Sequence, residues 1–328
     1  MPSSSALVPT TYASGAPLPA ILINAGESVI QRVLTFFTSH LPNPNTAEAY
    51  ARAVLPFLSW CDTQGLGLED VQAVHISGYL RELEEHRDLS ETSLKARLAG
   101  IRSLFRFLVE GGFLRYNPAH DVRGPKLRRR GGKTPHLEGP DMRKLLDAIE
   151  TESLVGLRDR ALISTMAYAF PRVSTALKLR VGDFEASGAG YSVYLRGKGG
   201  EQHRQALHHE AASAVLQWLE AAGITREQAP LFQGVWPPRG ARQKATGKVM
   251  QRNTVLQMVK RRAERLGMDG NLCTHSFRAT GITAYVEAGG SLQTAAQMAG
   301  HADVRTTQLY VRSSEKSLRS EVERIRFE

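Results

Sequence analysis

The chain has 328 residues, more than a single hydrophobic core usually supports, so two folded domains are expected. Its composition, 42% hydrophobic and 23% charged, excludes an intrinsically disordered protein. Lysines and arginines number 42 against 32 acidic residues, and the resulting formal charge of +10 favours a polyanionic partner such as nucleic acid.

The two cysteines, Cys61 and Cys273, are too far apart in the sequence for a CxxC metal site and too few for a disulfide framework. No signal peptide is recognisable at the start, and no apolar run approaches the roughly 18 residues of a membrane span. Phosphate-binding glycine motifs are absent as well. We therefore expect a cytoplasmic protein with no membrane partner, no metal and no nucleotide cofactor.

The first part of the chain is predicted to be helical. Residues 1–25 are rich in Ser, Pro, Ala and Thr without an apolar period, and are predicted to be a flexible tail. Residues 26–118 show helical periodicity throughout, which predicts an all-helical domain of four helices. Asn45 is expected to cap the second helix, Leu68–His86 to form the third, and Ser90 to cap the fourth.

Residues 119–138 are predicted to form an exposed basic linker. Between Arg123 and Lys133 the sequence holds six cations, several helix breakers and no acidic residue. Because this run lies between two folded segments, we expect it to contact phosphate groups directly. The cations expected to do so are Arg123, Lys126, Arg128, Arg129 and Arg130.

Residues 139–312 have a mixed pattern. Tyr191–Leu195 and Gln202–Leu207 alternate as strands do, which predicts a β-hairpin with Lys198 at its tip. The Pro- and Gly-rich loop at 230–250 has no predicted structure. Helices are expected at about 139–151, 155–169, from Pro171, 210–223, 251–266, 275–288, 292–299 and 304–311. The predicted fold class is therefore mainly α with a small β-sheet, an α+β fold.

The most informative motif is His275-x-x-Arg278, followed by Gly300-His301 and then by Tyr310. Residues three apart on a helix share a face, so His275 and Arg278 can point at one ligand. His301 is expected at an exposed corner between two helices, and Tyr310 one or two turns into the last helix. Taken singly, each residue also fits an ordinary surface or core position.

Taken together, and in this order along the chain, these residues resemble the tyrosine recombinases, the family of the phage integrases, Cre and Xer proteins. The resemblance covers about residues 140–312, whereas residues 26–118 agree with the family's core-binding domain only in length and helix count. It implies a two-domain, C-shaped clamp with a helical core-binding domain and a mixed catalytic domain. The six positions that match the family's catalytic residues are Arg172, Lys198, His275, Arg278, His301 and Tyr310.

The resemblance implies a role for each position. Arg172 and Arg278 would clamp the scissile phosphate, where planar guanidinium groups match two non-bridging oxygens, and His301 would hydrogen-bond a phosphate oxygen. The remaining three would handle covalent chemistry and protons. Tyr310 corresponds to the nucleophile that forms a 3′-phosphotyrosyl bond, and His275 to the base that accepts its proton. Lys198 corresponds to the general acid for the departing 5′-hydroxyl.

Two departures from the family pattern surround Arg172. In the family this arginine usually follows a glycine and a small or aliphatic residue, but here Phe170 and Pro171 precede it. A carboxylate usually stands three positions later, where this chain has Thr175.

The implied partner is double-stranded DNA carrying specific sites, bound by a homotetramer with or without a partner recombinase. No cofactor is implied, because a tyrosyl phosphodiester retains the energy needed for rejoining. The charged tail at 313–328 would dock on a neighbouring subunit. Two helices are expected to face DNA, one through Lys95, Arg97 and Arg102 and the other through Arg252, Lys260, Arg261, Arg262 and Arg265.

Two other functions fit the same residues. The first is a related strand transferase, such as a type IB topoisomerase or a telomere resolvase, that relaxes or resolves DNA with the same pocket. The second is a DNA-binding accessory protein that has lost catalysis, an alternative suggested by Pro171 and Thr175. The source of the element acted on, whether phage, transposon, plasmid or chromosome, is left open.

Overall fold

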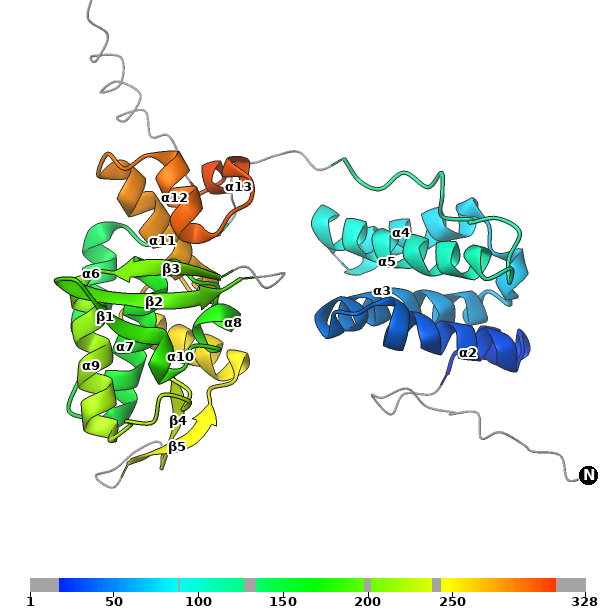
Figure 1. Cartoon of the computed structure of the whole chain (residues 1–328). Helices are drawn as coiled ribbons and strands as arrows, with labels where there is room; N and C mark the ends of the chain where they lie inside the picture. The colour runs from blue at the N-terminus through cyan, green and yellow to red at the C-terminus, as the bar shows by residue number, and fades with distance from the viewer. Residues whose placement is uncertain (1–17, 88, 127–133, 198–201, 238–242, 311–328) are drawn as a thin grey trace, which may run out of the picture. The chain divides into compact units, whose positions relative to one another are not determined.

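The computed structural model divides the chain into two compact units, Met1–Arg129 and Arg130–Glu328 (Figure 1). Among the residues that the structure describes, no helix is both long enough and apolar enough to cross a membrane. The described residues are 18–87, 89–126, 134–197, 202–237 and 243–310.

The described residues of the first unit form helices joined by turns, with no strand, and residues 111–126 follow the last helix without regular structure. Its longest helices, α3 and α5, lie side by side around an apolar core that includes Phe57 and Leu104 (Figure 1). Gly100 allows this close approach, because a Cβ there would lie 2.9 Å from the Cβ of Ala53. The elements are α1 (Ala20–Asn24), α2 (Glu27–Thr35), a π-helical turn η1 (Phe36–His40), α3 (Pro44–Thr63), a 3-10 turn η2 (Leu68–Asp70), α4 (Ala73–Arg87) and α5 (Glu91–Glu110).

The end of the predicted tail is folded, so the prediction of flexibility over residues 1–25 is wrong for its last part. Ile21 and Leu22 are buried in α1. The Asp62 carboxylate accepts the backbone N–H groups of Ala20, at 2.7 Å, and Ile21, at 2.5 Å. Residues 1–17 lie outside the described residues. Two apolar side chains and one acceptor 41–42 residues away in the sequence therefore order a segment that has no periodicity of its own.

Two helix boundaries in this unit also differ from prediction. Asn43, rather than Asn45, caps α3, since its side chain accepts the N–H of Asn45 at 3.0 Å. Pro44 explains the shift, because proline is well suited to the first helical position and moves the start forward. The expected third helix is split between η2 and α4. Ser90 caps α5 as predicted.

The second unit has helices packed around a small sheet. Its helices are α6 (Gly139–Asp147), α7 (Leu154–Tyr168), α8 (Val173–Ala176), α9 (His209–Ala222), α10 (Arg252–Arg265), α11 (Thr274–Glu287), α12 (Leu292–Ala299) and α13 (Val304–Gln308), and a 3-10 turn η3 spans Val181–Asp183. Its strands are β1 (Phe184–Ser187), β2 (Gly190–Arg196), β3 (Gln202–Leu207), β4 (Gln233–Trp236) and β5 (Lys244–Val249).

The sheet has the order β1-β2-β3 and is antiparallel, with Val193 opposite both Phe184 and Gln205. The predicted hairpin is therefore present, and its tip, residues 198–201, lies outside the described residues. A second antiparallel pair, β4 and β5, occupies the 230–250 segment. Its strands escaped prediction because β5 is almost wholly exposed and has no alternation of apolar residues.

Ten of the 15 residues of the central helix α7 are buried and the others are half-buried, because α9 and α11 both pack against it. The indole N–H of Trp218 on α9 donates to the carbonyl of Leu231 at 2.8 Å, which satisfies the largest buried side chain of the unit. In Figure 1, α12 and α13 lie at one end of the unit, whereas β4 and β5 lie at the other. A site at the end formed by α12 and α13 is thus separated from the end formed by β4 and β5 by the length of α7.

Candidate active site

His275 and Arg278 lie at the start of α11, as their spacing predicts. The helix begins after Cys273, whose backbone N–H donates to the Ser276 hydroxyl at 3.1 Å. Arg278 is only 1% exposed, although it carries a charge. Burial of a guanidinium requires hydrogen-bond partners, and this chain supplies them from two other segments.

Arg278 connects three parts of the sequence. Its Nη1 donates to the carbonyl of Phe170, and its Nη2 donates to the carbonyl of Ala299 at 2.7 Å and to Nε2 of His301 at 2.5 Å. Burial lowers the pKa of Arg278 to about 10, aided by the charge of Arg172 and opposed by the hydroxyl of Tyr310. Its Nε is buried without a hydrogen-bond partner among the described residues. These contacts hold one face of the guanidinium in a fixed orientation.

His301 lies in the turn between α12 and α13. Gly300 ends α12 with a left-handed φ of 59°, and Nδ1 of His301 lies 2.8 Å from the hydroxyl of Thr307. Burial, followed by the charges of Arg278, Arg172 and His275, lowers the pKa of His301 to about 4. The ring is therefore neutral at pH 7. Since Nε2 accepts from Arg278, the ring proton resides on Nδ1 and is donated to Thr307.

Tyr310 lies within hydrogen-bonding distance of His275, its hydroxyl 2.6 Å from Nε2. Its ring stacks on His301 with 5.9 Å between centroids, and its carbonyl accepts from the Thr283 hydroxyl. Burial and then the charges of Arg278 and Arg172 lower the pKa of His275 below 6.5. At pH 7 this imidazole is mostly neutral, and it is thus able to accept a proton from the phenol.

The position of Tyr310 in its element differs from prediction. Helix α13 ends at Gln308, so Tyr310 occupies the following turn rather than the helix itself. Its side chain is half-buried against the small apolar cluster of Phe170, Ile282 and Ala299. A turn position leaves the phenol free of the packing constraints of a helix interior.

Arg172 caps the N-terminus of α8 and is exposed. Its guanidinium has no hydrogen bond or ion pair with the described residues, yet its charge lowers the pKa values of His275, Arg278 and His301. Arg172 therefore belongs to the same cluster. Thr175, which replaces the family's carboxylate, leaves this cation without an acidic partner.

The backbone before Arg172 is strained. Phe170 has a φ of 55°, a left-handed conformation that costs a bulky residue about 1–2 kcal/mol. It stands where the resemblance leads us to expect glycine. Its ring is buried, and its carbonyl accepts from Arg278. Those contacts offset the strain and align the segment that carries Arg172.

Gly281 on α11 provides the space for Phe170. A Cβ at this position would lie 1.9 Å from the Ala167 carbonyl oxygen and 2.5 Å from the Phe170 ring. We therefore expect Gly281→Ala to destabilise the protein by about 3 kcal/mol in urea unfolding, the upper part of the usual range for overpacking. As a control, Gly78→Ala, at an exposed helical glycine with open space around it, should stabilise by about 0.5–1 kcal/mol. Equal effects of the two substitutions would contradict the packing argument.

The sixth predicted catalytic residue, Lys198, lies outside the described residues. The hairpin that carries it is described up to Arg196, which pairs with Gln202. On the other strand, His203 has a buried Nε2 without a partner among the described residues, and it faces Gly300. Sequence reasoning did not select His203. It also did not select Thr283 and Thr307, which hold Tyr310 and His301; only their nearness to the motif could have indicated them.

Arg262 does not face outward as predicted, because it is only 15% exposed and is paired with Asp159, whereas Arg265 is exposed. The other cations predicted to contact DNA fall into three groups. Two of them already bind backbone carbonyls. Arg97 donates to the carbonyl of Arg52, and Arg102 donates to the carbonyls of Ala119 and Val122. Arg102 thus fastens the segment after α5, a structural role that the sequence did not reveal. Those exposed without an ion pair among the described residues are Lys95, Arg123, Lys126, Arg252, Lys260 and Arg261. Those outside the described residues are Arg128, Arg129 and Arg130.

Comparison with known families assigns the chain. Residues 135–317, more than half of its length, match the phage integrase family, and residues 37–112 match the phage integrase N-terminal SAM-like domain. The chain belongs to the phage integrase family. The family match spans the five catalytic candidates that the structure describes.

Relatives and solved structures agree with this assignment. The chain is 29% identical over 300 residues to tyrosine recombinase XerC of Xanthomonas campestris, covering 89% of this chain and 87% of the relative. It is 29% identical over 267 residues to XerC of Xylella fastidiosa, a match that covers 81% of this chain and 85% of the relative. XerH bound to a palindromic difH substrate has a similar fold, with a TM-score of 0.71, 17% identity and coverage of 98% and 91%. A lambda integrase dimer bound to a COC′ core site also has a similar fold, with a TM-score of 0.65 and 17% identity. That match covers 85% of this chain and 75% of the integrase chain.

Among the described residues, no three or more His, Cys, Asp or Glu side chains are placed to hold a metal ion. The described site holds two guanidinium groups and two imidazoles around a phenol. Such an arrangement can hold an anionic group and present a nucleophile to it.

Proposed function

We propose that this phage integrase is a site-specific DNA recombinase, in which Tyr310 cleaves a DNA strand and forms a 3′-phosphotyrosyl bond. The observation that carries the proposal is the 2.6 Å contact between the Tyr310 hydroxyl and Nε2 of His275, next to the buried Arg278. A nucleophile, its base and an anion-binding group thus meet at one place, although 35 residues separate the first two.

In the proposed step, the phenol oxygen attacks the scissile phosphorus and the bond to the 5′-oxygen breaks. The phenol proton passes to His275, whose lowered pKa keeps it unprotonated at pH 7. An unperturbed phenol has a pKa of about 10, so ionisation without a base would cost about 4 kcal/mol at pH 7. Negative charge on the non-bridging oxygens is stabilised by Arg172 and Arg278.

Lys198 is proposed as the general acid that protonates the departing 5′-oxygen. Support comes from the resemblance and from the hairpin formed by β2 and β3, whose turn contains this lysine. Rejoining is the reverse reaction with a different 5′-hydroxyl, so no external energy source is needed.

His301 is proposed to donate to a phosphate oxygen, which requires a change in its hydrogen bonds. In the DNA-free protein its Nε2 accepts from Arg278 and its Nδ1 faces Thr307. An anionic phosphate nearby would raise its pKa from about 4 and favour the doubly protonated ring, which has two donors. The predicted role of His301 therefore depends on DNA being bound.

The division of labour along the chain is part of the same proposal. We assign residues 26–118 to a core-binding domain, 119–138 to a basic linker and 139–312 to the catalytic domain, which together would clamp DNA. The exposed cations of α5 and α10 would contact phosphates, as would the linker arginines. We further propose that the enzyme acts in the cytoplasm as a tetramer on the ends of a DNA element, alone or with a partner recombinase.

The C-terminal tail, residues 313–328, is proposed to bind an apolar groove on a second copy of the chain. A groove of about 800 Å³ is lined mainly by apolar side chains, including Leu146, Tyr285 and Met298. Tyr310, the last described residue, packs against the same buried cluster as Tyr285 and Met298, and Phe170 of that cluster also lines the groove, so the tail begins close to such a groove. Removing residues 313–328 should therefore abolish the tetramer on DNA in sedimentation experiments. A truncated protein that still forms tetramers would contradict this assignment.

The proposal is tested with a nicked suicide DNA substrate that traps the covalent intermediate. Binding sites are first selected from random DNA with the purified protein at several salt concentrations. Wild-type protein should give a covalent adduct on denaturing gels, and Tyr310→Phe should give none while binding DNA equally well. As a matched control, Tyr116→Phe, at an exposed tyrosine of the first unit, should form the adduct normally.

Three results would overturn the proposal. An adduct that persists in Tyr310→Phe would exclude this residue as the nucleophile. Site-independent relaxation of supercoiled plasmid would instead indicate a type IB topoisomerase-like activity. Specific binding without any adduct would indicate a DNA-binding accessory protein.

The rate of cleavage should have a distinct pH dependence. His275 must be neutral to accept the phenol proton, and its folded pKa is lowered below 6.5. The rate should therefore fall as the pH drops through the pKa of His275, and the midpoint of this fall should lie below the ordinary value of a free imidazole. Single-turnover cleavage measured from pH 5 to 8 checks this. A midpoint at or above the ordinary value of a free imidazole would contradict the lowered pKa.

A further inference from the structure

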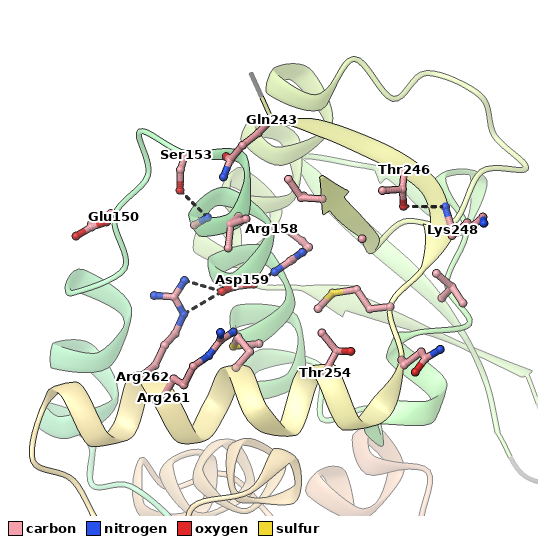
Figure 2. Close-up of a pocket in the computed structure, with 18 of the residues that line it drawn as sticks. Glu150, Ser153, Arg158, Asp159, Gln243, Thr246, Lys248, Thr254, Arg261 and Arg262 are labelled. Carbon is pink, nitrogen blue, oxygen red and sulfur yellow. Dashed lines mark hydrogen bonds and ion pairs between the residues drawn. The ribbon is translucent and has the colours of Figure 1, made fainter. Parts of the chain in front are cut away.

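A cationic cavity of about 680 Å³ lies near the start of α7, away from the Tyr310 site. Its walls come from the first turns of α7, from α10 and from the β4–β5 pair (Figure 2). None of the five described catalytic candidates lines it. Phe170 and Arg172 follow the other end of α7, about 22 Å away at 1.5 Å per residue. The cavity is thus a separate site.

A buried charge network forms the floor of this cavity. Oδ1 of Asp159 accepts from Nε and Nη2 of Arg158, at 3.0 and 2.6 Å. Oδ2 accepts from Nε and Nη2 of Arg262, at 3.0 and 2.5 Å, and Figure 2 shows these last two contacts. The side chains of Asp159, Arg158 and Arg262 are only 2%, 7% and 15% exposed. Two guanidinium groups therefore share one carboxylate, which leaves an excess positive charge in a largely buried place.

This network goes beyond what is needed to join α7 to α10. One arginine and one carboxylate would suffice for that, whereas a second buried cation costs free energy unless an anion accompanies it. The Nη1 atoms of Arg158 and Arg262 have no hydrogen-bond partner among the described residues. Both guanidinium groups therefore keep donors for a ligand.

Further positive charge surrounds the opening. Lys248, Arg261 and Arg265 line the cavity and form no ion pair with described residues. Among the described lining residues, Glu150 is the only acidic one besides Asp159. The lining residues carry five cations and two carboxylates, an excess of three positive charges. Such a cavity attracts anions.

Two helix N-termini add to this field. The N-cap residues of α7 and α10, Ser153 and Gln251, both line the cavity. Neither helix has an acidic residue in its first turn. The Ser153 hydroxyl already accepts the N–H of Gly156 at 3.1 Å, whereas Gln251 forms no side-chain cap. The helix dipole at both ends, and the uncapped N–H groups of α10, favour an anion.

We propose that this cavity is a second phosphate-binding site, which takes a phosphate group in contact with Arg158, Arg262 and Lys248. Guanidinium forks match phosphate oxygens bidentately, and the five cations suit a group with more than one negative charge. The phosphate could come from the DNA backbone outside the cleavage site or from a small phosphorylated molecule. The cavity's chemistry is the same for both, and it does not depend on catalysis by Tyr310.

Calorimetric titration with inorganic pyrophosphate tests the free-ligand source. It uses full-length protein carrying Arg172→Gln, which weakens anion binding at the candidate active site, and constant ionic strength. In this background Lys248→Gln or Arg158→Gln should weaken binding at least about tenfold, whereas Lys144→Gln, at an exposed lysine of α6, should leave it unchanged. Lys248 is exposed, so its substitution keeps the test valid if Arg158→Gln fails to fold.

The DNA source is tested by the salt dependence of affinity for a duplex. The slope of log K against log salt is negative, and each lost phosphate contact makes it less steep by about 0.9. Pyrophosphate binding that both cavity variants weaken supports a free ligand. A slope that is less steep in the cavity variants but not in Lys144→Gln, without pyrophosphate binding, supports a DNA phosphate. If the cavity variants match wild type in both measurements, the proposal is overturned. Tyr310→Phe, which tests the proposed recombinase activity, should bind pyrophosphate normally, so the two proposals can fail separately.

Discussion

Arg278→Lys is expected to slow strand cleavage by about 10²–10³-fold, the usual effect of removing a preorganised donor from a developing anion. Lysine retains the charge, but it has no planar fork and cannot reach the carbonyls of Phe170 and Ala299 and the ring of His301 together. The substitution therefore loses orientation more than charge. Single-turnover cleavage of the suicide substrate at saturating DNA measures the effect.

The matched control is Arg305→Lys, at an exposed arginine of α13 near the site. Its cleavage rate should remain within about twofold of wild type, because no described contact of its guanidinium is lost. Urea unfolding of both variants distinguishes a loss of catalytic rate from a loss of protein stability. A wild-type rate in folded Arg278→Lys would show that the fixed guanidinium is dispensable, and it would remove the main support for the phosphate clamp.

Asp159→Ala should be the most destabilising substitution in the second unit, at about 3–5 kcal/mol in urea unfolding. Its carboxylate accepts four hydrogen bonds from Arg158 and Arg262, and its removal leaves two cations side by side in a largely buried place. If the adjacent cavity binds phosphate, pyrophosphate should restore part of the loss by replacing the missing anion.

Asp147→Ala provides the comparison. This carboxylate is 57% exposed and lies 4.0 Å from Arg160, so its loss should cost less than about 1 kcal/mol. Similar losses at positions 147 and 159 would mean that the buried network contributes no more than a surface pair. That outcome would also weaken the argument that its excess charge requires a ligand.

The surroundings of Arg172 show how this chain keeps a family site with different residues. Phe170 takes a left-handed conformation in place of the expected glycine, and Gly281 on α11 provides room for its ring. The carbonyl of Phe170 then binds Arg278, so the strained residue links the two arginines through the backbone. No carboxylate of the described residues pairs with Arg172 in place of the one that the family has at the position of Thr175.

Prediction from sequence succeeded where the determinant is local. The spacing of His275 and Arg278 required only a helix, and Ser90 capped the helix that its neighbours predicted. It failed where distant segments decide, as with α1, which Asp62 fastens from α3. The exposed strand β5 has no apolar alternation, and its partner β4 alone determines its structure.

The sequence by itself determined the family, the mainly helical class and the order of the catalytic candidates, because spacing along one helix and residue identity are encoded locally. Only the tertiary structure decided that Arg278 is buried and bound to two distant carbonyls, that His301 is neutral, and that the Tyr310 hydroxyl meets His275. It also brought Asp159 on α7 to Arg262 on α10, 103 residues apart. Burial and the convergence of charges depend on how helices pack, and packing joins residues that no sequence window contains together.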